Sequence, residues 1–124
     1  MRDIRFRGKT LKGEWIVGDL LRTNGQTGDG WAIQYEDPES GLMMEDVRVG
    51  TIGQFTGLHD KDGRDIYEGD IVQWDKDQKL YVVEFRNGMF YASVEPCNPR
   101  VYGGFPLWFL CEEDQHCSIV GNRF

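Results

Sequence analysis

The sequence predicts an all-β fold of small barrels, built from many short antiparallel strands. Most apolar segments are about four to eight residues long, rich in β-branched and aromatic side chains, with glycine, proline, asparagine or aspartate between them. No stretch repeats apolar residues at helical spacing for more than about two turns, so a helix is possible only at 42–48. Short strands at this spacing indicate a barrel or a sandwich.

Length and composition indicate one folded domain. The chain has 124 residues, of which 40% are hydrophobic, and this suffices for one domain over 1–124 or for two small β subdomains, about 1–50 and 51–124, that share a core. No run approaches the ~20 apolar residues of a membrane-spanning helix, and no apolar stretch follows the charged residues at the start. We therefore expect a cytoplasmic protein that does not contact a membrane.

The cysteines are odd in number and form no C-x-x-C pair. Cys97, Cys111 and Cys117 therefore do not suggest a disulfide framework, and they fit a reducing compartment. We expect free thiols that pack as small apolar side chains and have no redox role.

Charge is distributed unevenly along the chain. The net charge is −7, but residues 1–12 hold five cations against Asp3 alone, a net +4, which leaves −11 for the remainder. An acidic body repels phosphate, so nucleic-acid binding would depend on a local basic patch.

The first half of the chain predicts a series of strands and turns. Ile4 and Phe6 alternate with Arg5, Arg7 and Lys9, which predicts a half-buried strand with apolar groups on one face and cations on the other. A turn region at 8–13 and a strand at 15–21, with a bulge at the glycine in position 18, complete a hairpin. The loop 23–30, a strand at 31–35, a turn at 37–41 and a further strand or two at 42–49 follow.

The central stretch, 51–72, contains the most turn residues. Ile52 and Phe55 can be buried, a tight surface turn follows at 60–63, and Ile66 and Tyr67 provide core anchors before a second turn. A strand begins again at Asp70, so a turn lies on each side of the short buried segment that holds Ile66 and Tyr67. Gly69→Val should therefore impair folding. We assign this stretch to folding, through the motif Gly57, Asp60, Gly63, Ile66, Tyr67, Glu68, Gly69 and Asp70.

The second half predicts one especially clear hairpin. Segments 80–86 and 89–95 flank Asn87-Gly88, a pair that takes the two positive φ angles of a type I′ turn. The prolines and glycines of 96–105 predict irregular structure, and 106–111 and 118–120 would be the last strands, around a polar turn at 112–116.

The string G-L-x-D-x-x-G-x-x-I-Y-E-G-D-I-V at 57–72 resembles the YopX family of phage and prophage proteins. The opening IRFRGKTLKGEWIVGDLL and the closing SIVGN also resemble the ends of that family, so the resemblance extends over the whole chain. It implies a compact all-β protein with an SH3-like barrel element, carried by bacteriophages. It implies no catalytic residue and no ligand, because the family is functionally uncharacterised.

Metal sites and catalytic residues are not evident from the spacing. The run 60–65 looks like a calcium loop, but glycine is its fourth residue instead of its sixth. His116 and the cysteines lack the paired spacing of zinc ligands, and neither His59 nor His116 has a recognisable catalytic partner. We expect no cofactor, no metal and no enzymatic activity.

A non-enzymatic binding module is the function we expect, acting on a host or phage protein. The alternative is a nucleic-acid-binding module that uses a basic face, although such a face also serves as a solvated edge that prevents aggregation. The residues of that candidate face are Arg5, Arg7, Lys9, Lys12 and Trp15. A homo-oligomer, in which this face meets the acidic 60–77 region of another copy, is a further possibility, and an acidic mimic of DNA is a remote one.

Overall fold

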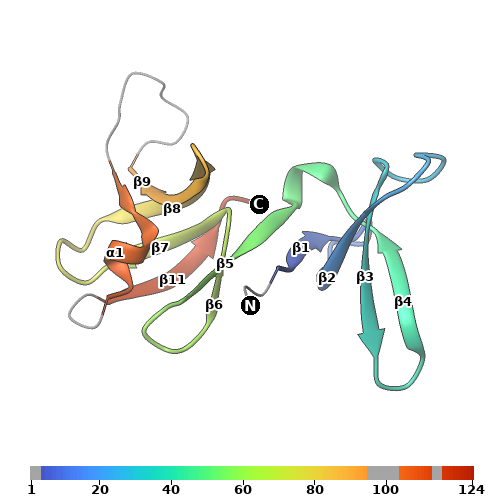
Figure 1. The fold of residues 1–124 in the computed structure, drawn as a ribbon, viewed down its shortest axis with the longest axis horizontal. Helices are drawn as coiled ribbons and strands as arrows, with labels where there is room; N and C mark the ends of the chain where they lie inside the picture. Colours follow the sequence, from blue (N-terminus) through green and yellow to red (C-terminus); the bar gives the residue numbers. More distant parts are fainter. Residues whose placement is uncertain (1–3, 95–103, 113–115) are drawn as a thin grey trace. The chain divides into compact units, whose positions relative to one another are not determined.

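The computed structural model describes residues 4–94, 104–112 and 116–124, and these form two compact units (Figure 1). The first unit is Met1–Phe55 and the second is Thr56–Phe124. The division falls inside strand β5 (Gly53–His59), so the central stretch, 51–72, contributes to both units.

The first unit is an antiparallel meander. Its strands follow the order β4-β3-β2-β1-β5, and each sequential pair from β1 to β4 forms a hairpin. A short 3-10 helix, η1, precedes β5. The bounds are β1 Phe6–Lys9, β2 Trp15–Arg22, β3 Trp31–Asp37, β4 Gly41–Asp46 and η1 Val49–Thr51.

The second unit contains a five-stranded sheet in the order β10-β9-β8-β7-β11, and β6 pairs with the end of β5. One helical turn, α1, separates the last two strands in sequence. The bounds are β6 Asp65–Tyr67, β7 Asp70–Trp74, β8 Leu80–Arg86, β9 Met89–Ser93, β10 Gly104–Pro106, α1 Leu107–Leu110 and β11 Cys117–Asn122.

The predicted all-β class is confirmed. Neighbouring strands in both sheets pair in antiparallel fashion, as β1 does with β2 and β8 with β9, and the strands are three to eight residues long. The predicted barrel does not close within the described residues, because the five-stranded sheet ends at β10 on one side and at β11 on the other. The two edge strands are joined through α1 and are not neighbours in a hydrogen-bonded ladder.

The strongest local prediction, the Asn87-Gly88 hairpin, is confirmed. Both residues have positive φ angles, 51° and 79°, and the flanking strands β8 and β9 pair from Arg86↔Met89 onward. A two-residue loop with these angles has the twist of the strands it connects, so the local sequence alone determines this turn.

The predicted strand at 106–111 is wrong, because residues 107–110 form α1. Leu107 and Leu110 are three residues apart and both are fully buried, as expected for one face of a helical turn. Pro106 stands at the N-cap, where its lack of an amide hydrogen has no cost. A short apolar run is compatible with either a strand or a helix. The segment 42–48, where the sequence permitted a helix, instead contains most of β4, Gly41–Asp46.

Two smaller predictions also need correction. Ile4 lies before β1 and is 61% exposed, so it does not extend the apolar face of that strand. Gly104 and Phe105, predicted as irregular, belong to β10; the rest of that segment, 96–103, and most of the predicted turn at 112–116 lie outside the described residues.

Gly18 does not form the predicted bulge; it allows a close approach between strands. A side-chain Cβ at this position would lie 2.1 Å from the backbone oxygen of Gln34 on β3. Gly18 pairs with Phe6 of β1, while β2 pairs with β3 from Asp19 onward. Only glycine allows the strand to change its partner at this short distance.

The two units have cores of different size. In the second unit, Trp74 and Tyr81 pack edge to face in a buried cluster that also contains both leucines of α1. In the first unit, the buried apolar residues among those described are Ala32, Ile33, Val47 and Phe55. None of the helices in the described part of the chain has the length and apolar character needed to cross a membrane.

Candidate functional site

An exposed mixed face covers β2, β3 and β4 in the first unit. The cross-strand pairs Asp19↔Gln34, Gln34↔Met44 and Glu36↔Leu42 bring alternate residues of three strands to one side of the sheet. Val17 is two residues before Asp19 and extends the same side. We call this the outer face: Val17, Asp19, Gln34, Glu36, Leu42 and Met44.

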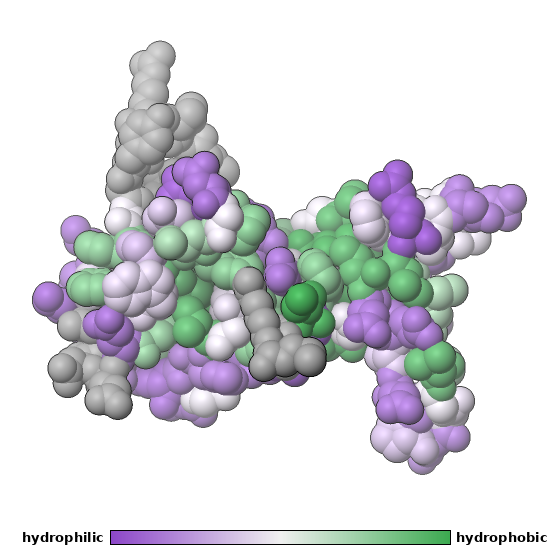
Figure 2. Space-filling model, viewed as in Figure 1, coloured by the Kyte–Doolittle hydropathy of each residue, from purple (hydrophilic) through white to green (hydrophobic). Residues whose placement is uncertain are grey.

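The outer face exposes three large apolar side chains to solvent. Leu42 is 67% exposed, Met44 is 57% exposed and Val17 is 42% exposed. In the space-filling view, hydrophobic and hydrophilic patches alternate along the β3–β4 hairpin (Figure 2). Adjacent exposed apolar side chains on one face are typical of an interaction surface.

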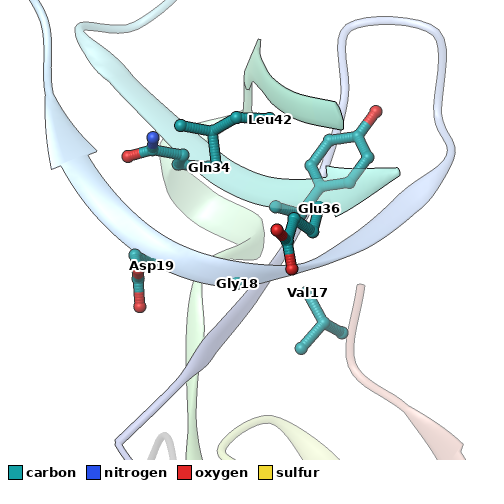
Figure 3. Close-up of a pocket in the computed structure, with 7 residues that line it drawn as sticks. Val17, Gly18, Asp19, Gln34, Glu36 and Leu42 are labelled. Carbon is teal, nitrogen blue, oxygen red and sulfur yellow. The ribbon is translucent and has the colours of Figure 1, made fainter. Parts of the chain in front are cut away.

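A hollow of about 450 Å³ opens on this face, and Figure 3 shows the side chains that line it. Asp19, Gln34, Glu36 and Leu42 come from three neighbouring strands, and Val17 and Gly18 complete the lining together with Tyr35. β2 pairs with β1 up to Gly18 and with β3 from Asp19 onward. No β2 residue is therefore paired with Glu36 on β3, and the hollow lies at this position.

The hollow is acidic. Asp19 and Glu36 line it, and its lining contains no cation. Over residues 15–46 seven carboxylates stand against Arg22 alone, a net charge of −6. The surrounding field therefore attracts cationic groups and repels phosphate.

Tyr35 also borders the hollow, but its side chain is bonded on the other side of β3. Its hydroxyl donates a 2.9 Å hydrogen bond to the Glu45 carboxylate. This bond raises the pKa of Tyr35, with smaller contributions from burial and nearby acidic groups, so the phenol remains a neutral donor. The bond fixes the ring on the opposite side of β3 from Gln34 and Glu36.

The predicted basic face is partly assembled. The Arg7 guanidinium lies 4.6 Å from the ring centroid of Trp15, and the Lys9 ammonium lies 5.3 Å from the same ring. Arg5 stacks on a different ring, 4.1 Å from the centroid of Phe55. These cations cover aromatic rings that would otherwise be available for stacking on a base.

Lys12 is separated from that row. It lies in the β1–β2 turn and lines a second hollow of about 280 Å³ together with the carboxylates of Glu14, Glu45 and Asp46. A cation surrounded by three carboxylates is poorly placed to bind phosphate. The structure therefore groups Arg7, Lys9 and Trp15, and places Lys12 elsewhere.

The central motif contains a buried carboxylate that joins a turn to a distant strand. Asp60 accepts hydrogen bonds from the backbone N–H groups of Asp62, Arg64 and Ile119 at 3.0, 2.9 and 3.1 Å, and from the Arg64 side chain. Burial raises the pKa of Asp60, but the three backbone bonds and the guanidinium outweigh it, so the pKa lies below its ordinary value. The turn thus uses the carboxylate oxygens that a calcium ion would need.

The other motif residues lie in turns and in the core. Gly57, Gly63 and Gly69 all have positive φ angles, Ile66 and Tyr67 are buried, and Glu68 lies in the turn before β7. Asp70 is 1% exposed and accepts a 2.8 Å bond from the Tyr67 N–H. These contacts are within the second unit and do not reach the outer face.

His59 has a partner that the sequence did not suggest. Its Nε2 lies 2.9 Å from the Asp65 carboxylate, across the β5–β6 hairpin, where both side chains are substantially exposed. Within the described residues, no three histidine, cysteine or acidic side chains gather to hold a metal ion. Cys111 and Cys117 are free thiols, and Cys97 lies outside the described residues.

The outer face was missed because its signal is not local. The run Gly41–Asp46 shows exposed apolar residues at alternate positions, but only the strand order reveals that β4 is an edge strand with one uncovered face. Asp19 and Glu36 come together only through the β2–β3 register.

The fold and this face together define a small all-β protein with an exposed apolar and acidic sheet surface. The family comparison covers the central string at 57–72 that resembles the YopX pattern. The chain belongs to the YopX protein family, whose family model matches residues 5–123, nearly the whole chain. A comparison with curated proteins gave no significant match.

Proposed function

We propose that this protein is a non-enzymatic, protein-binding module, and that the outer face is its binding surface. The observation that supports the proposal is the exposure of Leu42, Met44 and Val17 beside an acidic hollow. Membership of the YopX family supports a phage-type protein, and we place its action on a host or phage protein in the bacterial cytoplasm.

Contact with a partner would remove the exposed apolar side chains of the outer face from water. Burying apolar surface contributes about 25 cal/mol per Å², so covering exposed leucine, methionine and valine side chains favours association. The hollow lies beside them and has room for a side chain from the partner. Interfaces of this kind combine an apolar centre with a polar rim.

The charge of the face indicates the partner chemistry. Asp19 and Glu36 line the hollow without a cation, so a lysine or arginine side chain would find two carboxylates there. The adjacent apolar residues favour an aliphatic or aromatic neighbour in the same partner segment. We therefore expect an extended protein segment in which a cationic residue stands beside apolar ones.

An NMR titration with defined peptides tests this proposal directly. The probes are an extended peptide with arginine between leucines and the same peptide with glutamate in place of arginine. We expect the arginine peptide to shift the methyl signals of Leu42, Met44 and Val17, and the glutamate peptide to leave them unchanged. Equal shifts from both peptides, or shifts confined to the second unit, would contradict the proposed site.

Affinity capture from phage-infected cells extends the test to natural partners. The variant Leu42→Ser/Met44→Ser should lose a retained protein partner. The control Leu80→Ser should keep it, because Leu80 is 54% exposed but belongs to the second unit. Nuclease treatment should have no effect on capture; loss of the partner after nuclease would instead indicate a bridging nucleic acid.

Nucleic-acid binding is the second candidate, and the grouping of Arg7, Lys9 and Trp15 supports it. Each cation that contacts a phosphate would make binding depend on salt. A gel shift at low salt with single- and double-stranded DNA and RNA should detect it, and Arg5→Gln/Arg7→Gln/Lys9→Gln should abolish it. A parent protein that binds none of these nucleic acids would remove this candidate.

Self-assembly is a separate proposal. The basic N-terminal residues of one copy would meet the acidic 60–77 region of another, a contact between unlike surfaces that can close into a ring. Light scattering at low salt should then show a species larger than a monomer, which dissociates as salt screens the charges. A monomer at tens of micromolar in low salt would contradict it.

A further inference from the structure

Two thiols meet where α1 ends and β11 begins. Cys111 directly follows α1, and its N–H donates a 3.1 Å bond to the Trp108 carbonyl. Cys117 is the first residue of β11 and pairs in register with Trp74 of β7. The two sulfur atoms are 3.9 Å apart, so the fold holds both thiols in contact although five residues separate them in the sequence.

Contrary to the expectation from the cysteine spacing that these thiols have no redox role, we propose that Cys111 and Cys117 form a reversible disulfide by exchange with a low-molecular-weight disulfide, which makes the pair a redox modification site. The Cys111 thiolate attacks one sulfur of the small disulfide, forming a mixed disulfide and releasing one small thiol. Cys117 then loses its proton and attacks the Cys111 sulfur, which releases the second small thiol. Two protein thiols are oxidised and one external disulfide is reduced.

Burial gives the two cysteines different roles. Cys117 is 1% exposed, whereas Cys111 is partly exposed at the end of the helical turn. Cys111 can therefore meet a reagent from solvent, and Cys117 can resolve the mixed disulfide from inside. The hydrogen bond with Cys117 lowers the pKa of Cys111 against the opposing effect of burial, while the same bond and burial raise the pKa of Cys117.

The required movement is small. A disulfide bond is about 2.05 Å long, so the sulfur atoms must come closer by roughly 1.9 Å from their 3.9 Å contact. Cys111 is only partly buried and packs at the edge of the core cluster, so a change of its side-chain rotamer is the movement that the bond requires. The reduced pair is therefore close to a geometry that permits the bond.

The bond would join α1 to β11 within the second unit. Cys117 belongs to the buried cluster of that unit, and Cys111 packs against it. Closing a short loop reduces the freedom of the unfolded chain, so the oxidised protein should unfold at a temperature several degrees higher. Neither cysteine lies on the outer face, so this inference is independent of the proposed binding function.

Incubation with oxidised glutathione tests the inference. We expect the intact mass of protein without bound glutathione to fall by two hydrogen atoms, and at least two of the three thiols to become unreactive in denaturant. Peptide mapping should show Cys111 joined to Cys117, and a reducing agent should reverse the change. A disulfide between Cys97 and either of the other cysteines, or three free thiols after incubation with excess reagent, would overturn the proposal.

Matched variants separate the pair from the third cysteine. Cys97→Ser should still lose two hydrogen atoms, and Cys111→Ser should not. The unfolding temperature of Cys97→Ser should rise on oxidation, and that of Cys111→Ser should not respond. If Cys111→Ser fails to fold, the stepwise labelling of the parent decides instead: alkylation of native protein should modify Cys111 faster than Cys117, and the reverse order would contradict the roles given above.

Discussion

Replacing Asp60 with alanine should destabilise the protein, because one carboxylate holds three backbone groups. The substitution removes the acceptor of the Asp62, Arg64 and Ile119 N–H groups, whose bonds are 3.0, 2.9 and 3.1 Å long. It also removes the partner of the Arg64 guanidinium, whose Nη2 lies 2.9 Å from the carboxylate. The turn at 60–63 would then keep its backbone bond to β11, the 2.9 Å bond from the Lys61 N–H to the Cys117 carbonyl, but would lose the bonds that the carboxylate makes.

The magnitude follows from which of these groups water can reach. The side chain of Asp60 is 0% exposed, so the Ile119 N–H would lose its acceptor at a site that water reaches poorly. Leaving this N–H without a partner costs about 1–3 kcal/mol of stability. The turn N–H groups are partly exposed and recover bonds to water. The Arg64 side chain is 53% exposed, so its ion pair adds little. We expect a total loss of about 2–4 kcal/mol.

Equilibrium unfolding in urea, followed by tryptophan fluorescence, measures this loss. The matched control is Asp62→Ala, because the Asp62 side chain is 62% exposed and lies 3.7 Å from Arg64. The control should change the free energy of unfolding by less than about 0.5 kcal/mol. If Asp60→Ala also stays within that range of the parent, the carboxylate of Asp60 does not stabilise the contact between the turn and β11, and the reasoning is wrong.

Three further predictions concern the same unit. Gly69→Val should lower the unfolding temperature of the protein more than Gly57→Val does. Both glycines have positive φ angles, but a Cβ at Gly69 would lie 2.3 Å from the Phe124 ring, whereas nothing lies within 4 Å at Gly57. Equal losses in thermal unfolding would contradict this. Because the pKa of Asp60 is lowered in the folded state, its carboxylate contributes stability that is present above the ordinary aspartate pKa of about 3.9 and is lost as the pH falls through the folded-state pKa. The free energy of unfolding of Asp60→Asn should therefore depend less on pH in acid than that of the parent. Parallel plots of this free energy against pH for the two proteins would refute the prediction. Burial and the hydrogen bond to the Asp77 carboxylate raise the pKa of Tyr81 to about 12. Tyr81→Phe should therefore remove the last step of phenolate formation from an absorbance titration. A titration that is unchanged at high pH would show that Tyr81 does not account for that step.

The sequence predicts best where a structure depends on adjacent residues. Asn87-Gly88 determines its turn through two backbone angles, so the β8–β9 hairpin followed from the local sequence. Leu107–Leu110 is too short for periodicity to distinguish strand from helix, so the packing of both leucines decided the outcome.

The candidate sites depend on information that no local pattern contains. The outer face exists because β4 is an edge strand and because Glu36 and Leu42 are cross-strand partners. The contact between Cys111 and Cys117 depends on where α1 ends relative to β11, and the spacing of the cysteines gave no sign of it. By contrast, the alternation of Arg5, Arg7 and Lys9 was visible, but their stacking on aromatic rings was not.

The exchange of strand partners at Gly18 separates two properties of the hollow. The change of partner holds position 18 to glycine, because a side chain there would collide with the Gln34 carbonyl. Val17, Glu36 and Leu42 line the hollow with side chains that stand at least partly in solvent. On the proposed binding function, substitutions at these three residues would change which partner segment fits the hollow, while Gly18 keeps the strand arrangement beneath it.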